Sequence, residues 1–215
     1  MFLQPTAADG ADGTALHGGR TPPTGQVWTT HAIVDEMTWH YLLSIEVSAP
    51  WKIHSRDLYP MMPDTAAAVE TDGWVAHPWF TGHSPTACAH GSHALASGCV
   101  VAAVKTAAQI PALHNTRPIM VQNDTKSFDL LTLAPVSSAG WVLLGEVGRY
   151  VRVSSDRFDD VTFSAAGVHA SLSGSQGETI EVTALQPLAG KAEWLVQVKT
   201  VTFAGDTATV EFTHK

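Results

Sequence analysis

Short apolar runs separated by turn residues recur along this chain from Gln26 onward, and they constrain its fold more than any other feature. Runs rich in Val, Thr, Leu and aromatic side chains, bounded by Gly, Pro, Ser and Asp, are typical of β-strands. The segments that fit this pattern are 27–34, 39–48, 73–80, 98–105, 117–122, 128–136, 140–154, 160–164, 168–174, 178–187, 193–203 and 207–213.

The alternation of apolar and polar residues is clearest near the end of the chain. Ile180, Val182 and Ala184 fall on one face of a strand, because successive side chains in a strand point to opposite faces. The turn segments 173–178 and 204–207 separate neighbouring runs at hairpin distances. We therefore expect an all-β fold, an antiparallel β-sandwich of Greek-key or jelly-roll type.

Two segments depart from the strand pattern. Residues 1–25 consist mostly of Gly, Ala, Asp, Thr and Pro with little to bury, which predicts a disordered lead or linker before one domain over 26–215. Residues 63–70, "PDTAAAVE", predict one short helix with Asp64 as a possible N-cap. No internal repeat is evident.

The net charge of the chain limits the classes of molecule that it is expected to bind. The chain has 12 basic and 20 acidic residues among 215, a net charge of −8, whereas nucleic acids and anionic membranes are bound by an excess of Lys and Arg. We therefore expect no nucleic-acid or membrane partner, and small neutral ligands fit better. Neither a signal peptide nor a transmembrane run is seen, so a cytoplasmic or plastid location is favoured over secretion.

The segment "HSPTACAHGSHALASGC" holds both cysteines and three histidines. Cys88, His90, His93 and Cys99 are residue types that bind zinc, but the segment lacks the close ligand pair of a structural zinc knuckle. A Cys88–Cys99 disulfide is a second possibility. The third is a pair of separate thiols with histidines on a polar loop, and this interpretation is favoured, so no metal or other cofactor is predicted.

No catalytic residue stands out. Glycoside hydrolysis needs two carboxyl groups facing each other across a cleft, and the sequence alone cannot pair its acidic residues. The acidic stretch 154–160, "SSDRFDD", is interpreted as a solvated turn. The chain has no G-x-S-x-G turn for a serine nucleophile and no phosphate-binding loop.

Seven tryptophans are the remaining candidates for ligand contact. An exposed indole can stack on a sugar ring, whereas a buried one fills a core, and each tryptophan is individually expected in the core. If a carbohydrate platform exists, Trp51 and Trp79 are its most plausible members, together with Trp74 beside His77.

Several segments resemble, in order, the C-terminal β-domain of the raffinose synthase and seed imbibition protein family, alkaline α-galactosidase-like members of the family-36 glycoside hydrolases. Residues 45–80 resemble its strand, basic-x-x-Asp-hydrophobic element and short helix, with Arg56-Asp57-Leu58 at the dipeptide. "FDLLTLAPV" (128–136) and "GWVLLGEVGRYV" (140–151) resemble the strand and hairpin that follow. The similarity is one of pattern over 26–215, and residues 81–99 have no counterpart.

The resemblance implies an accessory domain that supports a catalytic barrel. In that family the two catalytic aspartates lie on the barrel, which takes about 250 residues and is absent from this chain. Barrel docking would leave an apolar patch of several hundred Å² exposed here. The alternatives are a stand-alone carbohydrate-binding module, whose partner is an oligosaccharide, and a small metal-dependent hydrolase using the His/Cys segment.

Overall fold

The protein is described from a computed structural model, which covers residues 4–5, 26–45, 74–78, 89–90, 94–95, 100–102, 118–121, 124–188 and 193–214. Within these ranges every regular element is a β-strand and every strand pair is antiparallel. The predicted all-β antiparallel sandwich is therefore confirmed. The helix expected over 63–70 lies outside the described residues.

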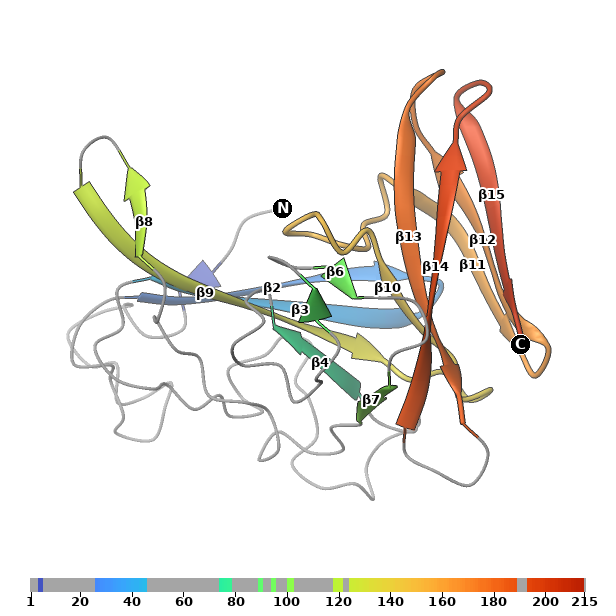
Figure 1. Ribbon diagram of the computed structural model, residues 1–215, viewed down its shortest axis with the longest axis horizontal. Helices are drawn as coiled ribbons and strands as arrows, with labels where there is room; N and C mark the ends of the chain where they lie inside the picture. Colours follow the sequence, from blue (N-terminus) through green and yellow to red (C-terminus); the bar gives the residue numbers. More distant parts are fainter. Residues whose placement is uncertain are drawn as a thin grey trace.

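The largest sheet, called the long sheet here, has the strand order β1-β2-β3-β9-β4 (Figure 1). Its strands are β1 (Gln4–Pro5), β2 (Gln26–Val34), β3 (Met37–Ile45), β9 (Asp124–Pro135) and β4 (Trp74–Pro78), and β8 (Pro118–Val121) also pairs with β9. β1 falls inside the expected lead 1–25, so these two residues have a strand partner in β2. A separate pair joins β5 (Ala89–His90) to β6 (Ala94–Leu95).

Two further sheets stand against each other beside the long sheet (Figure 1). The four-stranded sheet has the order β10-β13-β14-β7, and the three-stranded sheet has the order β11-β12-β15. Their bounds are β10 (Val142–Gly145), β13 (Thr179–Pro187), β14 (Glu193–Thr202), β7 (Val100–Ala102), β11 (Phe158–Ser164), β12 (Gly167–Ser173) and β15 (Thr207–Thr213).

The last four strands form one long hairpin that folds over on itself. β13 pairs with β14 in one sheet, and β12 pairs with β15 in the other. Backbone hydrogen bonds continue through the fold, from Phe203 N to Glu178 O at 2.9 Å and from Gly174 N to Asp206 O at 2.9 Å. A hairpin folded across two sheets is the jelly-roll-like arrangement predicted from the sequence.

Two details of the prediction are wrong. The turns 173–178 and 204–207 are not hairpin turns, because each joins strands in different sheets and Phe203 is buried at the corner. The strand expected over 140–154 ends at Gly145, which has a φ of +73°. A Cβ at Gly145 would lie 2.2 Å from the carbonyl oxygen of Arg152, since the chain turns back there into an irregular loop.

One hydrophobic core joins the three sheets. The long sheet contributes the face that carries Trp39, Tyr41, Val75 and Ala134, and the two smaller sheets contribute their facing side chains, including Phe158, Leu172, Val182, Val196 and Phe212. The other face of the long sheet is also buried, at Leu42, Leu131 and Leu133. Burial on both faces explains why the apolar runs of β3 and β9 are nearly continuous in sequence.

Large exposed apolar side chains are few on the described surface. They are Ile33 on β2 and the neighbours Tyr150 and Val151 on the loop after β10. The broad apolar patch expected for barrel docking is therefore not seen within the described ranges. No helix in the described part has the length and apolar character needed to cross a bilayer.

Candidate functional site

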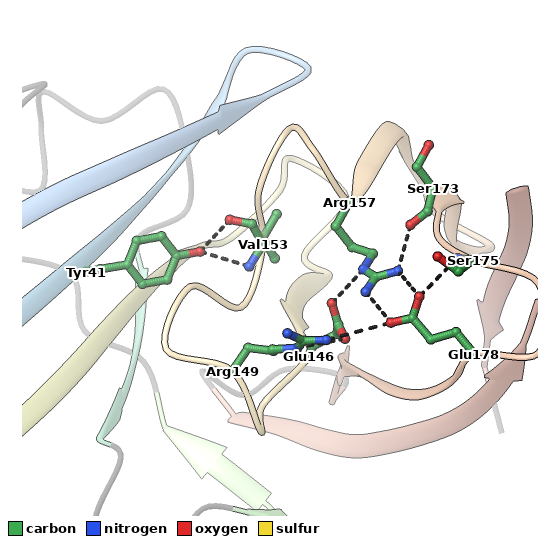
Figure 2. Close-up of polar contacts among 8 residues, drawn as sticks. All are labelled: Tyr41, Glu146, Arg149, Val153, Arg157, Ser173, Ser175 and Glu178. Atoms are coloured by element: carbon green, nitrogen blue, oxygen red, sulfur yellow. Dashed lines mark hydrogen bonds and ion pairs between the residues drawn. The ribbon is translucent and has the colours of Figure 1, made fainter. Parts of the chain in front are cut away.

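Three connections between the two smaller sheets meet at one end of the sandwich. They are residues 146–157 between β10 and β11, residues 174–178 between β12 and β13, and residues 203–206 between β14 and β15. Ends of sandwiches where loops gather are common binding sites. Ion pairs between charged side chains, Arg157 with Glu146 and with Glu178, lie at this end (Figure 2).

Arg157 lies at the centre of this end and contacts all three connections. Its Nε donates to Glu146 at 3.0 Å, and its two terminal nitrogens donate to both carboxylate oxygens of Glu178 at 3.0 and 2.5 Å. Nη1 also donates to the carbonyl of Ser173 at 2.7 Å. The guanidinium carbon lies 5.5 Å from the centre of the Phe203 ring, within the range of a cation–π contact.

These contacts hold both partners in their charged forms. The hydrogen bonds from Arg157, followed by the one from the Ser175 backbone N–H, lower the pKa of Glu178 to about 2. The hydrogen bonds to Glu178 raise the pKa of Arg157, although partial burial opposes this. Bidentate arginine–carboxylate pairs are geometrically specific, so this cluster fixes how the three connections lie relative to one another.

A second arginine lies further out. Arg149 approaches Glu146 Oε2 at 3.6 Å and Glu178 Oε1 at 3.7 Å, beyond hydrogen-bond distance, and 59% of its side chain is exposed (Figure 2). It is attracted to the two carboxylates without being fixed by them.

An open pocket of about 450 Å³ lies over this cluster. Its lining is polar and charged: Glu146, Arg149, Val151, Ser154, Asp156, Arg157, Ser173, Gly174, Ser175 and Glu178. Such a volume falls in the range of small-molecule sites. Val151 lines the pocket and is 41% exposed, whereas its neighbour in sequence, Tyr150, is 60% exposed and is not a lining residue.

The loop that carries this pocket is held from the other side by the long sheet. The hydroxyl of Tyr41 donates to the carbonyl of Val153 at 2.7 Å and accepts from its N–H at 2.9 Å (Figure 2). The indole N–H of Trp39 donates to the carbonyl of Leu143 at 2.8 Å, just before the loop. The pocket is therefore built on an anchored loop, which suits binding.

A buried polar pair lies beneath the same loop. The guanidinium of Arg152 contacts Nδ1 of His77 on β4. Burial lowers the pKa of Arg152, while the nearby Tyr41 hydroxyl raises it. Because an arginine has no acceptor, Nδ1 of His77 must accept, which places the ring proton of neutral His77 on Nε2.

Four tryptophans in the described ranges have buried side chains, as expected for each tryptophan taken individually. Trp39 and Trp141 are fully buried, and Trp194 and Trp74 are nearly so, with Trp74 7% exposed in β4. Trp74 therefore has little ring surface available for stacking on a sugar. Trp51 and Trp79, the other proposed platform members, lie outside the described residues. The carbohydrate platform stays a prediction.

The His/Cys segment is mostly outside the described residues. This applies to Cys88, His93 and Cys99, and only the backbone of His90 is described, in β5. Across the described ranges there is no group of three His, Cys, Asp or Glu side chains that could hold a metal ion. The proposed disulfide and metal site therefore stay untested.

Sequence reasoning missed the role of Arg157. The acidic residues of its stretch, Asp156, Asp159 and Asp160, are exposed as expected for a solvated turn. Arg157 instead points inward to two glutamates that are 11 and 21 residues away in sequence. The sequence signal that could have indicated this role is the position of Arg157 as a single basic residue directly before Phe158, where an alternating strand begins.

Comparison with known proteins gives no relative for this chain: no family model, no curated protein and no solved structure matches it.

Proposed function

We propose that this chain is a non-catalytic accessory β-sandwich domain of a carbohydrate-active enzyme of the raffinose synthase and α-galactosidase type. In that role it supports a separate catalytic barrel and does not itself break a glycosidic bond. The sandwich architecture and the segment-by-segment resemblance support the proposal.

The arrangement of Glu146 and Glu178 is the observation that carries it. A glycosidase needs a general acid whose pKa is raised and a second carboxylate opposite it. Here the two glutamates bind the same guanidinium, and the pKa of Glu178 is held at about 2. At neutral pH Glu178 is thus an anion held in a structural contact, the opposite of a proton donor.

The described surface limits how a barrel could dock. Tyr150 and Val151 form the one apolar spot with adjacent members within the described ranges, and Ile33 lies on a different sheet. A docking contact through these ranges would therefore be more polar than a domain core, as interfaces between domains of one chain often are.

An activity assay tests the non-catalytic part. The purified chain is incubated with p-nitrophenyl α-galactoside and with raffinose from acid to alkaline pH. We expect neither hydrolysis nor galactosyl transfer above the blank. Turnover that is abolished by Glu146→Gln or Glu178→Gln would contradict the proposal.

A complementation assay tests the supporting role. A family-36 α-galactosidase barrel lacking its own C-terminal β-domain is mixed with this chain, and its thermal unfolding is followed. We expect a higher Tm for the barrel in the mixture than alone, because anything that binds only the folded state stabilises it. An unchanged Tm together with no co-migration on gel filtration counts against a barrel partner.

A further inference from the structure

The three-stranded sheet has two edges, and one of them, β11, is guarded against pairing with another strand. Its ladder with β12 shifts between Phe158 and Asp160, and such a bulge twists an edge away from a further partner. The N–H of Val161 donates to Oδ2 of Asp35 at 2.5 Å, and the exposed carboxylates of Asp159 and Asp160 lie on the strand. Bulges and charges are the usual means by which edge strands avoid other chains.

The opposite edge, β15, has none of these features. Its register with β12 runs without a shift from Thr207 to Thr213, and the strand "TATVEFT" has no proline and a single charged residue, Glu211. Alternate residues of a strand that is paired along one side direct their N–H and C=O groups away from the ladder. Within the described ranges no strand pairs with the outer side of β15, and only the carbonyl of Thr213 is bound by a side chain, that of Gln197 at 2.8 Å. The edge therefore offers a row of backbone donors and acceptors to a further strand.

An open groove of about 440 Å³ lies along this edge, between β15 and β14 of the facing sheet (Figure 1). Its lining side chains are mostly threonine and alanine, so the backbone of another strand can come close. Lys199 is the cation of the groove, and its Nζ is folded back over the Phe212 ring, 5.7 Å from the ring centre. The lining residues are Lys199, Thr200, Val201, Thr202, Ala204, Thr207, Ala208, Thr209, Val210 and Glu211.

The edge of β15 is complementary to a second copy of itself. In antiparallel pairing about a two-fold axis, residue i of one copy lies opposite residue j of the other, and j opposite i. An axis at Val210, the middle residue, pairs all seven residues of β15 and places Glu211 opposite Thr209 of the second copy. An axis at Glu211 would instead place two carboxylates directly opposite each other, which is destabilising. Charge therefore favours the register centred on Val210.

We propose that this chain forms a symmetric dimer in which β15 pairs antiparallel with β15 of a second copy. The two three-stranded sheets then become one six-stranded sheet, and the second copy covers the groove between β14 and β15. A foreign peptide is a poorer occupant, because strand addition gains its specificity from side-chain pockets, whereas this groove is open and its side chains are small. The dimer goes beyond the accessory role proposed above and does not depend on it.

Sedimentation velocity of the intact chain, from about 1 to about 500 µM, tests the dimer. We expect a monomer at low concentration and a dimer, without larger species, at high concentration. Hydrogen exchange at the two ends of this range locates the contact: backbone amides of β15 should exchange more slowly in the dimer, and those of the guarded edge β11 should not change.

Two substitutions at Thr209 test the register. Thr209 is exposed on β15, and in the proposed dimer it lies opposite Glu211 of the second copy. Thr209→Lys creates two attractive pairs across the interface and should lower the dimer Kd about threefold to tenfold. Thr209→Glu creates two repulsive pairs and should raise the Kd by a similar factor. Opposite effects at one position cannot come from a general loss of folding.

Thr162 provides the matched control. It is an exposed threonine on β11, the other edge of the same sheet. Thr162→Lys and Thr162→Glu change the net charge of the chain by the same amounts as the Thr209 variants, and they should leave the dimer Kd close to that of the parent chain. Thermal unfolding of each variant at low concentration verifies that the monomer is folded.

Three outcomes overturn the proposal: the chain stays monomeric up to about 500 µM, it forms open-ended oligomers, or it dimerises with the exchange of β15 unchanged and both Thr209 variants equal to the parent chain. None of them affects the accessory role, which depends on the inactivity of the chain and on barrel complementation. Detectable glycosidase turnover, in contrast, contradicts the accessory role and leaves the dimer standing.

Discussion

The hydroxyl of Tyr41, on the long sheet, satisfies both backbone groups of Val153, which lies 112 residues further along the chain. Val153 is fully buried and belongs to no strand, so its N–H and carbonyl have no ladder partner. Buried backbone groups must be paired, and a tyrosine hydroxyl can donate and accept at once. One side chain thereby joins the long sheet to the loop that carries the candidate pocket.

Tyr41→Phe should therefore destabilise the protein. The ring still fills its place in the core, but the N–H and carbonyl of Val153 lose their partner, which costs about 1–3 kcal/mol. Urea unfolding followed by tryptophan fluorescence measures the change. Equal stability of Tyr41→Phe and the parent chain would show that this hydroxyl is dispensable.

Gly174 is a second position where the candidate site dictates the residue. A Cβ placed there would lie 2.6 Å from two atoms of the Phe203 ring and 2.7 Å from Nη1 of Arg157. Gly174→Ala should displace the arginine or the ring and destabilise the protein by about 1–3 kcal/mol. Thermal unfolding measures the effect.

Gly205 provides the matched control for this substitution. It lies in the adjacent connection 203–206, and a Cβ there meets nothing within 4 Å. Gly205→Ala should leave stability unchanged or raise it slightly, because alanine restricts the unfolded chain. If both alanine variants behave alike, close packing around Arg157 is not what requires glycine at 174.

The sequence predicted strand positions well because alternation is a local property. Every strand segment expected from residue 27 onward overlaps an observed strand. Val210 and Phe212 point inward while Glu211 points outward, as period two requires. The pairing of strands was not predictable in the same way. Whether 173–178 closes a hairpin or turns a corner depends on Phe203, a residue 25 positions beyond Glu178 that is buried against it in space.

The candidate site was missed for the same reason. Arg157 and Glu146 lie at opposite ends of the connection 146–157, Glu178 lies in the connection 174–178, and only the folded hairpin brings the three together. The sequence suggested tryptophans as ligand-contacting residues, because an exposed indole can stack on a ligand. In the structure the side chains of Trp39, Trp141 and Trp194 are buried in the core. Arg149, which does line the pocket, lies in the segment "GRYV", whose local sequence resembles an ordinary strand.

His40 should make stability depend on pH. Burial, with a smaller contribution from neighbouring His31, lowers the pKa of His40 from 6.5 to about 4. Between these two values the unfolded chain binds a proton at His40 and the folded chain does not, so stability falls as pH falls from about 6.5 to about 4. The full loss for a shift of this size is about 3 kcal/mol.

Urea unfolding at a series of pH values measures this dependence. His40→Gln, which cannot titrate, should flatten the profile over that range whatever its effect on overall stability. His169→Gln alters an exposed histidine on β12 and is the control, with the parent slope retained. A parent slope that persists in His40→Gln would assign the dependence to other groups. The stability contributed by the Glu178–Arg157 contact is lost at lower pH, as the pH falls below about 4.5, because the pKa of the Glu178 carboxyl is lowered to about 2.

The tip of the β2–β3 hairpin is strained, and its two residues should respond differently to glycine. Asp35 and Glu36 have φ values of +46° and +67°, where turns of this kind usually carry Asn-Gly. At Asp35 the strain is offset by a hydrogen bond, since its Oδ2 accepts from the backbone N–H of Val161 on the edge strand β11 at 2.5 Å. Glu36→Gly should therefore stabilise the protein by about 1 kcal/mol, because glycine adopts positive φ without steric cost.

Asp35→Gly relieves the same kind of strain but removes the hydrogen bond to Val161, so it should be neutral or destabilising. Asp35→Asn keeps a side-chain acceptor and tolerates positive φ, and it should retain most of the parent stability. The Tm of the three variants, measured side by side, tests the argument. A rise for Asp35→Gly as large as that for Glu36→Gly would mean that the contact between the hairpin tip and β11 contributes nothing to stability.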